Sequence, residues 1–141
     1  MKLLSAERRS ANMARIRSTN TKPEMIVRRL VHSLGYRYRL HRKDLPGKPD
    51  IAFGPRRKII EVRGCYWHAH VRYDPACWEA RSESKSNRAY WGPKMDRNVE
   101  RDRKNLALLE AAGWRVLVIW ECQLRDMEAV RIQIGDFLGE K

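Results

Sequence analysis

Residues 49–63 read PDIAFGPRRKIIEVR, and this stretch decides the fold. Segment 50–53 contains the apolar run 51–53, and segment 58–63 contains the β-branched residues Ile59, Ile60 and Val62, so each predicts a strand. The Gly54-Pro55 pair between them is typical of a turn, and Gly64 ends the second strand. The stretch therefore predicts two adjacent strands of one sheet.

The sequence on either side predicts helices and further strands. Thr21, Pro23 and Glu24 form the pattern of a helix start, with the threonine as N-cap. The expected elements are a helix from 21 to 34, a strand over 36–40, a helix over 93–112, a strand over 114–120 and a helix over 126–138. This order predicts a single α/β domain over residues 1–141, in which helices flank a mixed central sheet.

Composition narrows the class of protein. The 141 residues carry 30 Lys+Arg against 17 Asp+Glu, a net charge of +13 that favours a polyanionic partner. The longest apolar run, 116–120, is too short to cross a membrane, and the first ten residues lack the apolar core of a secretory signal. Three cysteines cannot form a closed disulfide framework. We therefore expect a cytoplasmic, nucleoid-associated protein.

The basic charge is concentrated toward the N-terminus. Residues 1–43 hold twelve Lys/Arg and two acids. A DNA backbone is expected to lie along the basic segments 8–43 and 94–104, because Lys and Arg neutralise phosphates. Within residues 1–20 and the helix that follows, the expected DNA contacts are Arg15, Arg17 and Lys22.

Two acids on the adjacent strands indicate a site for a hard cation. Phosphodiester hydrolysis needs a divalent ion that neutralises the phosphate and activates water, and Mg²⁺ requires few protein ligands. Asp50, Glu61 and the Val62 carbonyl oxygen can converge on one Mg²⁺, which leaves Arg63 to meet a phosphate. This P-D…E-x-R spacing resembles the P-D…(D/E)-x-K signature of restriction-type nucleases. The alternative is a simple ion pair between Glu61 and Arg63.

Cysteines and histidines indicate a second metal. Cys65, His70, Cys77 and Cys122 offer three thiolates and one imidazole, the ligand set of a closed structural Zn²⁺ site. Such a site gives an irregular segment a fixed shape. The alternative is three inert buried thiols and a surface histidine.

The other histidines differ in their expected roles. His68 lies between two proposed zinc ligands, yet four ligands are complete without it. An imidazole near an activated water is suited to proton transfer, because its pKa lies near neutral pH. His32 and His41 are expected to be structural or surface residues.

Several motifs together resemble the very short patch repair (Vsr) endonucleases. They occur in the family's order over nearly the whole chain: SANM at 10–13, LPGKPD at 45–50, GCYWHAH at 64–70, NVERDR at 98–103, GWRVL at 113–117 and WEC at 120–122.

The resemblance implies a restriction-endonuclease-like fold and Mg²⁺-dependent nicking of one DNA strand beside a T·G mismatch, the product of 5-methylcytosine deamination. It implies that Asp50 and the Val62 oxygen bind Mg²⁺ and that His68 assists hydrolysis. It also implies zinc ligands at Cys65, His70 and Cys122, with Cys77 as the fourth. The remaining implied positions are a DNA-intercalating wedge of Met13, Tyr66 and Trp67, and polar active-site residues Glu24, Asn98 and Asp102.

The chain departs from the best-known members at Glu61-Val62-Arg63, where they have an apolar residue, a threonine and a histidine. Glu61 could restore a second acidic ligand. Two other functions are compatible with the sequence: a restriction-type nuclease without mismatch preference, and a zinc-containing DNA-binding module without catalysis. The expected partner is double-stranded DNA bound by a monomer, with a repair polymerase and ligase acting downstream.

Overall fold

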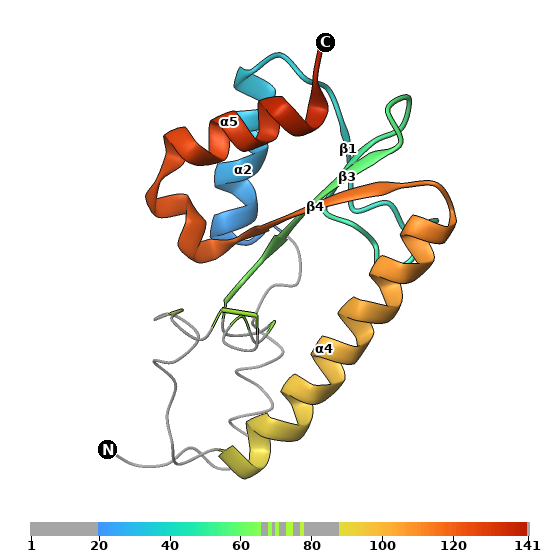
Figure 1. Cartoon of the computed structure of the whole chain (residues 1–141), viewed down its shortest axis with the longest axis vertical. Coiled ribbons are helices and arrows are strands. Elements are labelled where there is room, and N and C mark those ends of the chain that lie inside the picture. The colour runs from blue at the N-terminus through green and yellow to red at the C-terminus, as the bar shows by residue number, and fades with distance from the viewer. Residues whose placement is uncertain are drawn as a thin grey trace.

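The computed structural model describes residues 20–65, 68, 70, 73, 74, 77 and 88–140. Met13, Arg15, Arg17, Tyr66 and Trp67 lie outside these residues. The elements in chain order are α2 (Lys22–Ser33), β1 (Arg39–Leu40), β2 (Ile51–Phe53), β3 (Lys58–Arg63), α4 (Arg88–Ala111), β4 (Arg115–Trp120), the 3₁₀ helix η3 (Glu121–Arg125) and α5 (Met127–Leu138) (Figure 1).

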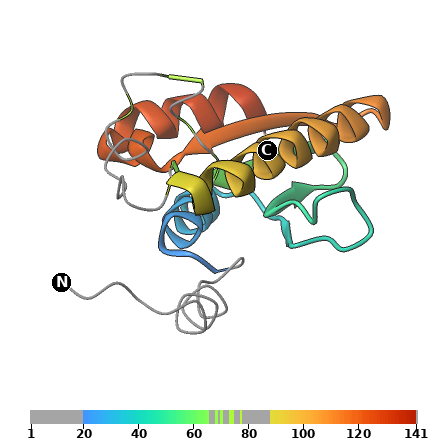
Figure 2. The same ribbon diagram turned by 90° about the horizontal axis from the view of Figure 1, so that it is seen from below.

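The four strands form one mixed sheet in the order β1-β2-β3-β4. The β1–β2 and β2–β3 pairs are antiparallel, and Ile51 lies opposite Ile60. The β3–β4 pair is parallel, because α4 carries the chain back across the sheet and leads directly into β4 (Figure 2). The expected mixed sheet flanked by helices is confirmed.

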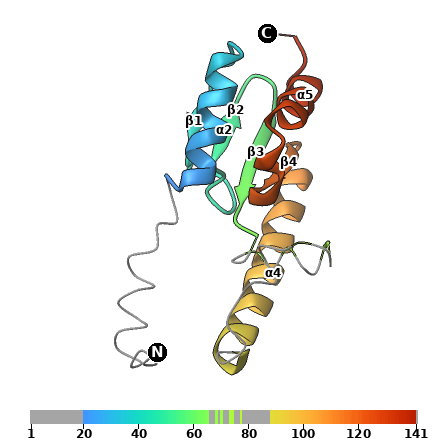
Figure 3. The same ribbon diagram turned by 90° about the vertical axis from the view of Figure 1, so that its left-hand side faces the viewer.

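Helices cover both faces of this sheet. The helices α2 and α5 lie side by side on one face, and α4 lies on the other (Figures 1 and 3). The larger core lies under α2 and α5 and includes Val27, Ile60 and Ile134. A smaller core joins Ile59 of β3 to Leu109 of α4. Alternate residues of β3 therefore face different cores, as the period of a strand requires.

The N-cap of α2 confirms the predicted helix start, whereas two other boundaries differ from the prediction. Thr21 accepts the N–H of Glu24. The first strand covers only Arg39 and Leu40, the two residues that pair with β2. The hydroxyls of Tyr36 and Tyr38 donate to the backbone carbonyls of Gly139 and Arg28. The helix α4 begins at Arg88 and contains Pro93. A proline inside a helix removes one backbone hydrogen bond and crowds one carbonyl, a local cost that this helix of 24 residues carries near its start.

The loop that leads into β2 rests against α4. Gly47 has a φ of +76°, and a Cβ at this position would lie 2.8 Å from the Asn105 Nδ2 atom. Only glycine combines this backbone conformation with so close an approach. The contact with α4 therefore helps to fix the loop that precedes Asp50.

Candidate active site and metal centre

Asp50 lies at one end of the sheet, one residue before the interior strand β2. Its Oδ2 atom accepts the Val62 N–H at 2.9 Å. Continuing the β2–β3 register by one residue places Glu61 opposite Asp50, and directly opposed residues project from the same face of a sheet. Burial raises the pKa of Asp50 to about 7, and the carboxylates of Glu24 and Glu61 act in the same direction. A cation beside Asp50 would favour its ionised form.

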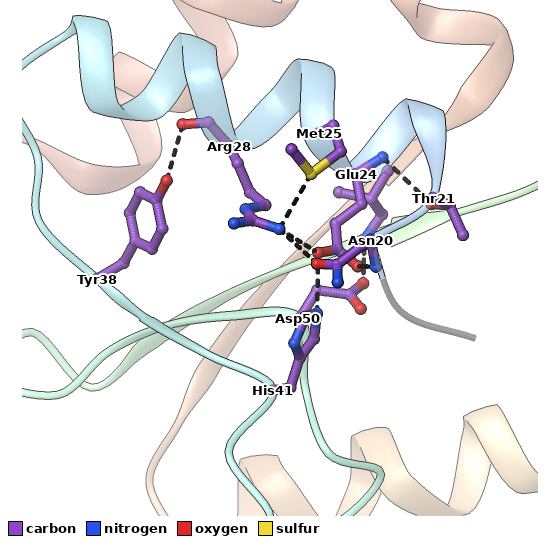
Figure 4. A network of polar contacts seen from close by, with 9 residues as sticks. Asn20, Thr21, Glu24, Met25, Arg28, Tyr38, His41 and Asp50 are labelled. Atoms are coloured by element: carbon purple, nitrogen blue, oxygen red, sulfur yellow. Dashed lines mark hydrogen bonds and ion pairs between the residues drawn. The ribbon is translucent and has the colours of Figure 1, made fainter. Parts of the chain in front are cut away.

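Glu24 reaches the same end of the sheet from the first turn of α2. It is 1% exposed, and its carboxylate accepts the Asn20 N–H and pairs with Arg28 at 3.3 Å. Burying a carboxylate is costly unless it has such partners. Glu24 and Asp50 point toward one another in Figure 4. The helix start recognised in the sequence therefore also positions a site residue.

His41 belongs to this cluster, although the sequence analysis expected it to be a structural or surface residue. Its Nε2 atom lies 2.8 Å from Glu24 Oε2, and its backbone N–H donates to the Asp50 carbonyl at 3.1 Å. Its φ of +45° is unusual for a residue other than glycine. The donor atoms of Glu24, His41 and Asp50 all lie within 4.8 Å of one another, a spacing that can hold a metal ion. Only the pairing of β1 with β2 reveals this position.

Replacing His41 with leucine is expected to lower the free energy of unfolding by about 1–3 kcal/mol, because the buried Glu24 carboxylate loses a hydrogen-bond partner. The His41→Gln variant retains a hydrogen-bond donor and is expected to recover most of that loss. Leucine and glutamine are both unbranched at Cβ, so the positive φ of position 41 affects the two variants about equally. Chemical denaturation of both variants measures the difference. Equal stabilities would show that the Glu24 contact contributes nothing.

Glu61 and Arg63 form an ion pair of 3.0 Å. Arg63 is 5% exposed, and its guanidinium carbon lies 5.6 Å from the ring centroid of Trp120. The sequence analysis left Arg63 to meet a phosphate; the structure instead buries it between Glu61 and Trp120. The ion pair considered as the alternative is therefore present, but it is largely shielded from solvent.

His68 and Asp102 form a second polar pair. The Nδ1 atom of His68 lies 2.6 Å from Asp102 Oδ2, and the backbone N–H of His68 donates to the Gly64 carbonyl. Asn98 precedes Asp102 by one turn of α4, and its side-chain oxygen accepts a hydrogen bond from Arg101. A carboxylate on Nδ1 fixes the ring and leaves Nε2 as the position for proton exchange.

Lys22, one of the expected DNA contacts, is exposed in the first turn of α2.

The proposed zinc ligands come together in the structure. The donor atoms of Cys65, His70, Cys77 and Cys122 lie within 4.8 Å of one another, and Cys122 Sγ lies 3.5 Å from His70 Nδ1. Burial raises the pKa of the Cys65 thiol, so a cation is needed to favour thiolates here. The His70 ring stacks on Trp120 with centroids 3.9 Å apart. The donor set and its spacing fit a closed tetrahedral metal site.

Comparison with known proteins assigns the chain to a family. The profile of the family described as DNA mismatch endonuclease Vsr matches residues 1–74. The type II nicking enzyme V.XorIIP of Xanthomonas oryzae pv. oryzae is 48% identical over 135 residues, which cover 96% of this chain and 95% of that protein. The chain belongs to the Vsr family. The resemblance noted in the sequence is therefore confirmed.

Further comparisons agree with the Vsr assignment. The DNA mismatch endonuclease Vsr of Escherichia coli K12 is 38% identical over 120 residues, which cover 85% of this chain and 73% of that protein. The catalytic domain of homing endonuclease I-Bth0305I superimposes with a TM-score of 0.55 and 26% identity, over 84% of this chain and 94% of that domain. The fold is restriction-endonuclease-like, and this Vsr-family protein is a DNA endonuclease. No helix in the part of the chain described by the structure could span a membrane.

Proposed function

We propose that the protein is a Mg²⁺-dependent endonuclease that nicks one DNA strand beside a T·G mismatch arising from 5-methylcytosine deamination. The observation that carries the proposal is the position of Asp50, whose carboxylate accepts the backbone N–H of Val62 at the end of the β2–β3 pair. Because the chain belongs to the Vsr family, we expect these acidic residues to serve the hydrolysis of a DNA phosphodiester.

The residues that would hold Mg²⁺ are Asp50, Glu61 and the Val62 carbonyl. In a strand, the N–H and C=O groups of one residue point toward the same neighbouring strand. Because the Val62 N–H reaches Asp50, its carbonyl faces that side too. Oxygen donors of this kind suit Mg²⁺. When bound, the ion would neutralise charge on the phosphate and make water more acidic.

His68 would accept the proton from the attacking water. Asp102 holds its Nδ1 atom, so Nε2 remains for the exchange and the imidazole keeps one orientation. A positioned base of this type contributes about 10²–10⁴-fold to a hydrolysis rate. Glu24 and Asn98 would complete the polar surroundings. Arg63 would act indirectly, by holding Glu61.

Mismatch preference would arise from the wedge proposed at Met13, Tyr66 and Trp67. Inserting apolar side chains into a base step costs a few kcal/mol, and the cost is lowest where pairing is already poor. Stacking on exposed bases returns about 1–3 kcal/mol per base. Arg15, Arg17 and Lys22 would hold the adjacent phosphates.

The test is a panel of otherwise identical duplexes that contain T·G, C·G or T·A at one position, incubated with and without Mg²⁺. We expect the T·G duplex to be nicked in one strand at least about tenfold faster, corresponding to 1.4 kcal/mol of discrimination. Equal cleavage of all duplexes would instead indicate a nuclease without mismatch preference. Binding without Mg²⁺-dependent nicking would indicate a DNA-binding module.

A further inference from the structure

A basic cavity lies beside the candidate active site. It has a volume of about 840 Å³ and is open to solvent, and its walls are residues 39–44 together with Gly54 and Pro55. The first of these segments is β1 and the turn after it, at the edge of the sheet. The cavity is therefore accessible to a long polymer as well as to a small molecule.

The charge of the cavity is positive. Arg39, Arg42 and Lys43 face a single acid, Asp44, so the lining carries three positive charges and one negative charge, +2 in total. Arg42 is paired with Asp44 through contacts of 3.0 and 2.6 Å. Arg39 and Lys43 are exposed, and neither has an acidic partner among the residues that the structure describes. Two cations are thus available to an anionic ligand.

His41 connects this cavity to the catalytic carboxylates. It lines the cavity, while its Nε2 atom contacts Glu24 and its backbone N–H donates to Asp50. An anion in the cavity would therefore lie next to the position of the reacting phosphate, separated from it by His41. Neighbouring phosphates of one DNA strand have this relation to one another.

We propose that the cavity binds the sugar–phosphate backbone of the nicked strand next to the cleavage position, through Arg39 and Lys43. The inference rests on the proposed function, which supplies DNA as the substrate. Exposed cations in an open cavity suit an extended polyanion, because phosphate contacts position DNA without reading its sequence. This subsite would fix the register of the strand relative to Asp50.

The first test measures the salt dependence of binding to a T·G duplex in buffer without added Mg²⁺. Each phosphate contact contributes about 0.9 to the slope of log affinity against log salt concentration. We expect Arg39→Ala and Lys43→Ala each to reduce the slope by about 0.9, and the double variant by about 1.8. Arg131→Ala, which removes the same charge from α5, is the matched control and should leave the slope unchanged.

The second test locates the contact on the DNA. Single neutral methylphosphonates are placed at successive positions around the nick. At one or two positions next to the nick, a methylphosphonate should weaken DNA binding by the wild-type protein. The same substitution should not weaken binding by the double variant further, because that variant already lacks both cations. Additive losses at every position would overturn the proposal, as would an unchanged salt slope.

The two tests separate this inference from the proposed function. Nicking of the same duplex by the wild-type protein is measured after Mg²⁺ is added. If nicking is absent while the salt slopes fall as expected, the proposed function fails, and only the phosphate contacts of Arg39 and Lys43 stand, without their place beside a nick. If nicking is present while the slopes are unchanged, the subsite fails and the proposed function stands.

Discussion

Replacing Asp50 with asparagine is expected to lower the rate of Mg²⁺-dependent nicking about a thousandfold, because a catalytic cation supplies several kcal/mol of charge stabilisation. Asparagine has nearly the same shape and can still accept the Val62 N–H, so the fold should be retained. The measurement is single-turnover nicking of a T·G duplex, combined with direct binding of the same DNA. Binding should change little.

The matched control is Asp136→Asn, which removes one exposed carboxylate near the C-terminal end of α5. It should nick at the wild-type rate. A wild-type rate in Asp50→Asn would remove Asp50 from the proposed mechanism. A large loss of DNA binding in that variant would mean that Asp50 acts in substrate binding.

Replacing His70 with alanine is expected to have the largest effect on stability. The purified wild-type protein should contain one equivalent of Zn²⁺, whereas the variant should lose most of it, because three thiolates remain without the fourth ligand. Structural Zn²⁺ contributes an apparent binding free energy of about 10–16 kcal/mol in small domains. Elemental analysis and thermal unfolding measure the two effects.

His32→Ala provides the comparison for His70→Ala, since His32 is an exposed histidine in the last turn of α2. That variant should keep both its metal and its unfolding temperature. A wild-type protein with less than half an equivalent of Zn²⁺ would contradict the zinc assignment. An unaltered unfolding temperature in His70→Ala would show that the cluster does not support the fold.

Local signals in the sequence were sufficient to predict most of the elements. The β2 and β3 strands and the start of α2 follow from apolar runs, turn residues and an N-cap, which act over a few residues. The first strand was predicted too long because residues 36–38 show the alternation of a strand, whereas only Arg39 and Leu40 pair with β2. The start of α4 was placed too late because Pro93 resembles a first-turn proline.

The candidate site was partly predictable for the same reason. Residue types alone indicated the cysteine–histidine cluster, since these four side chains form a known ligand set. The contact of His41 with Glu24 and the burial of Arg63 against Trp120 arise only from tertiary packing. No period or spacing in the sequence encodes such contacts.

The length of the β2–β3 turn constrains both candidate metal sites at once. The β3 strand presents Glu61 and Val62 beside Asp50, and the chain reaches Cys65 three residues later. Inserting or deleting one residue at Arg56-Arg57 would invert the side chains of β3 relative to its two cores. The acidic cluster around Asp50 and the cysteine–histidine cluster would then both lose their alignment. Natural variation in loop length is therefore expected elsewhere in the chain.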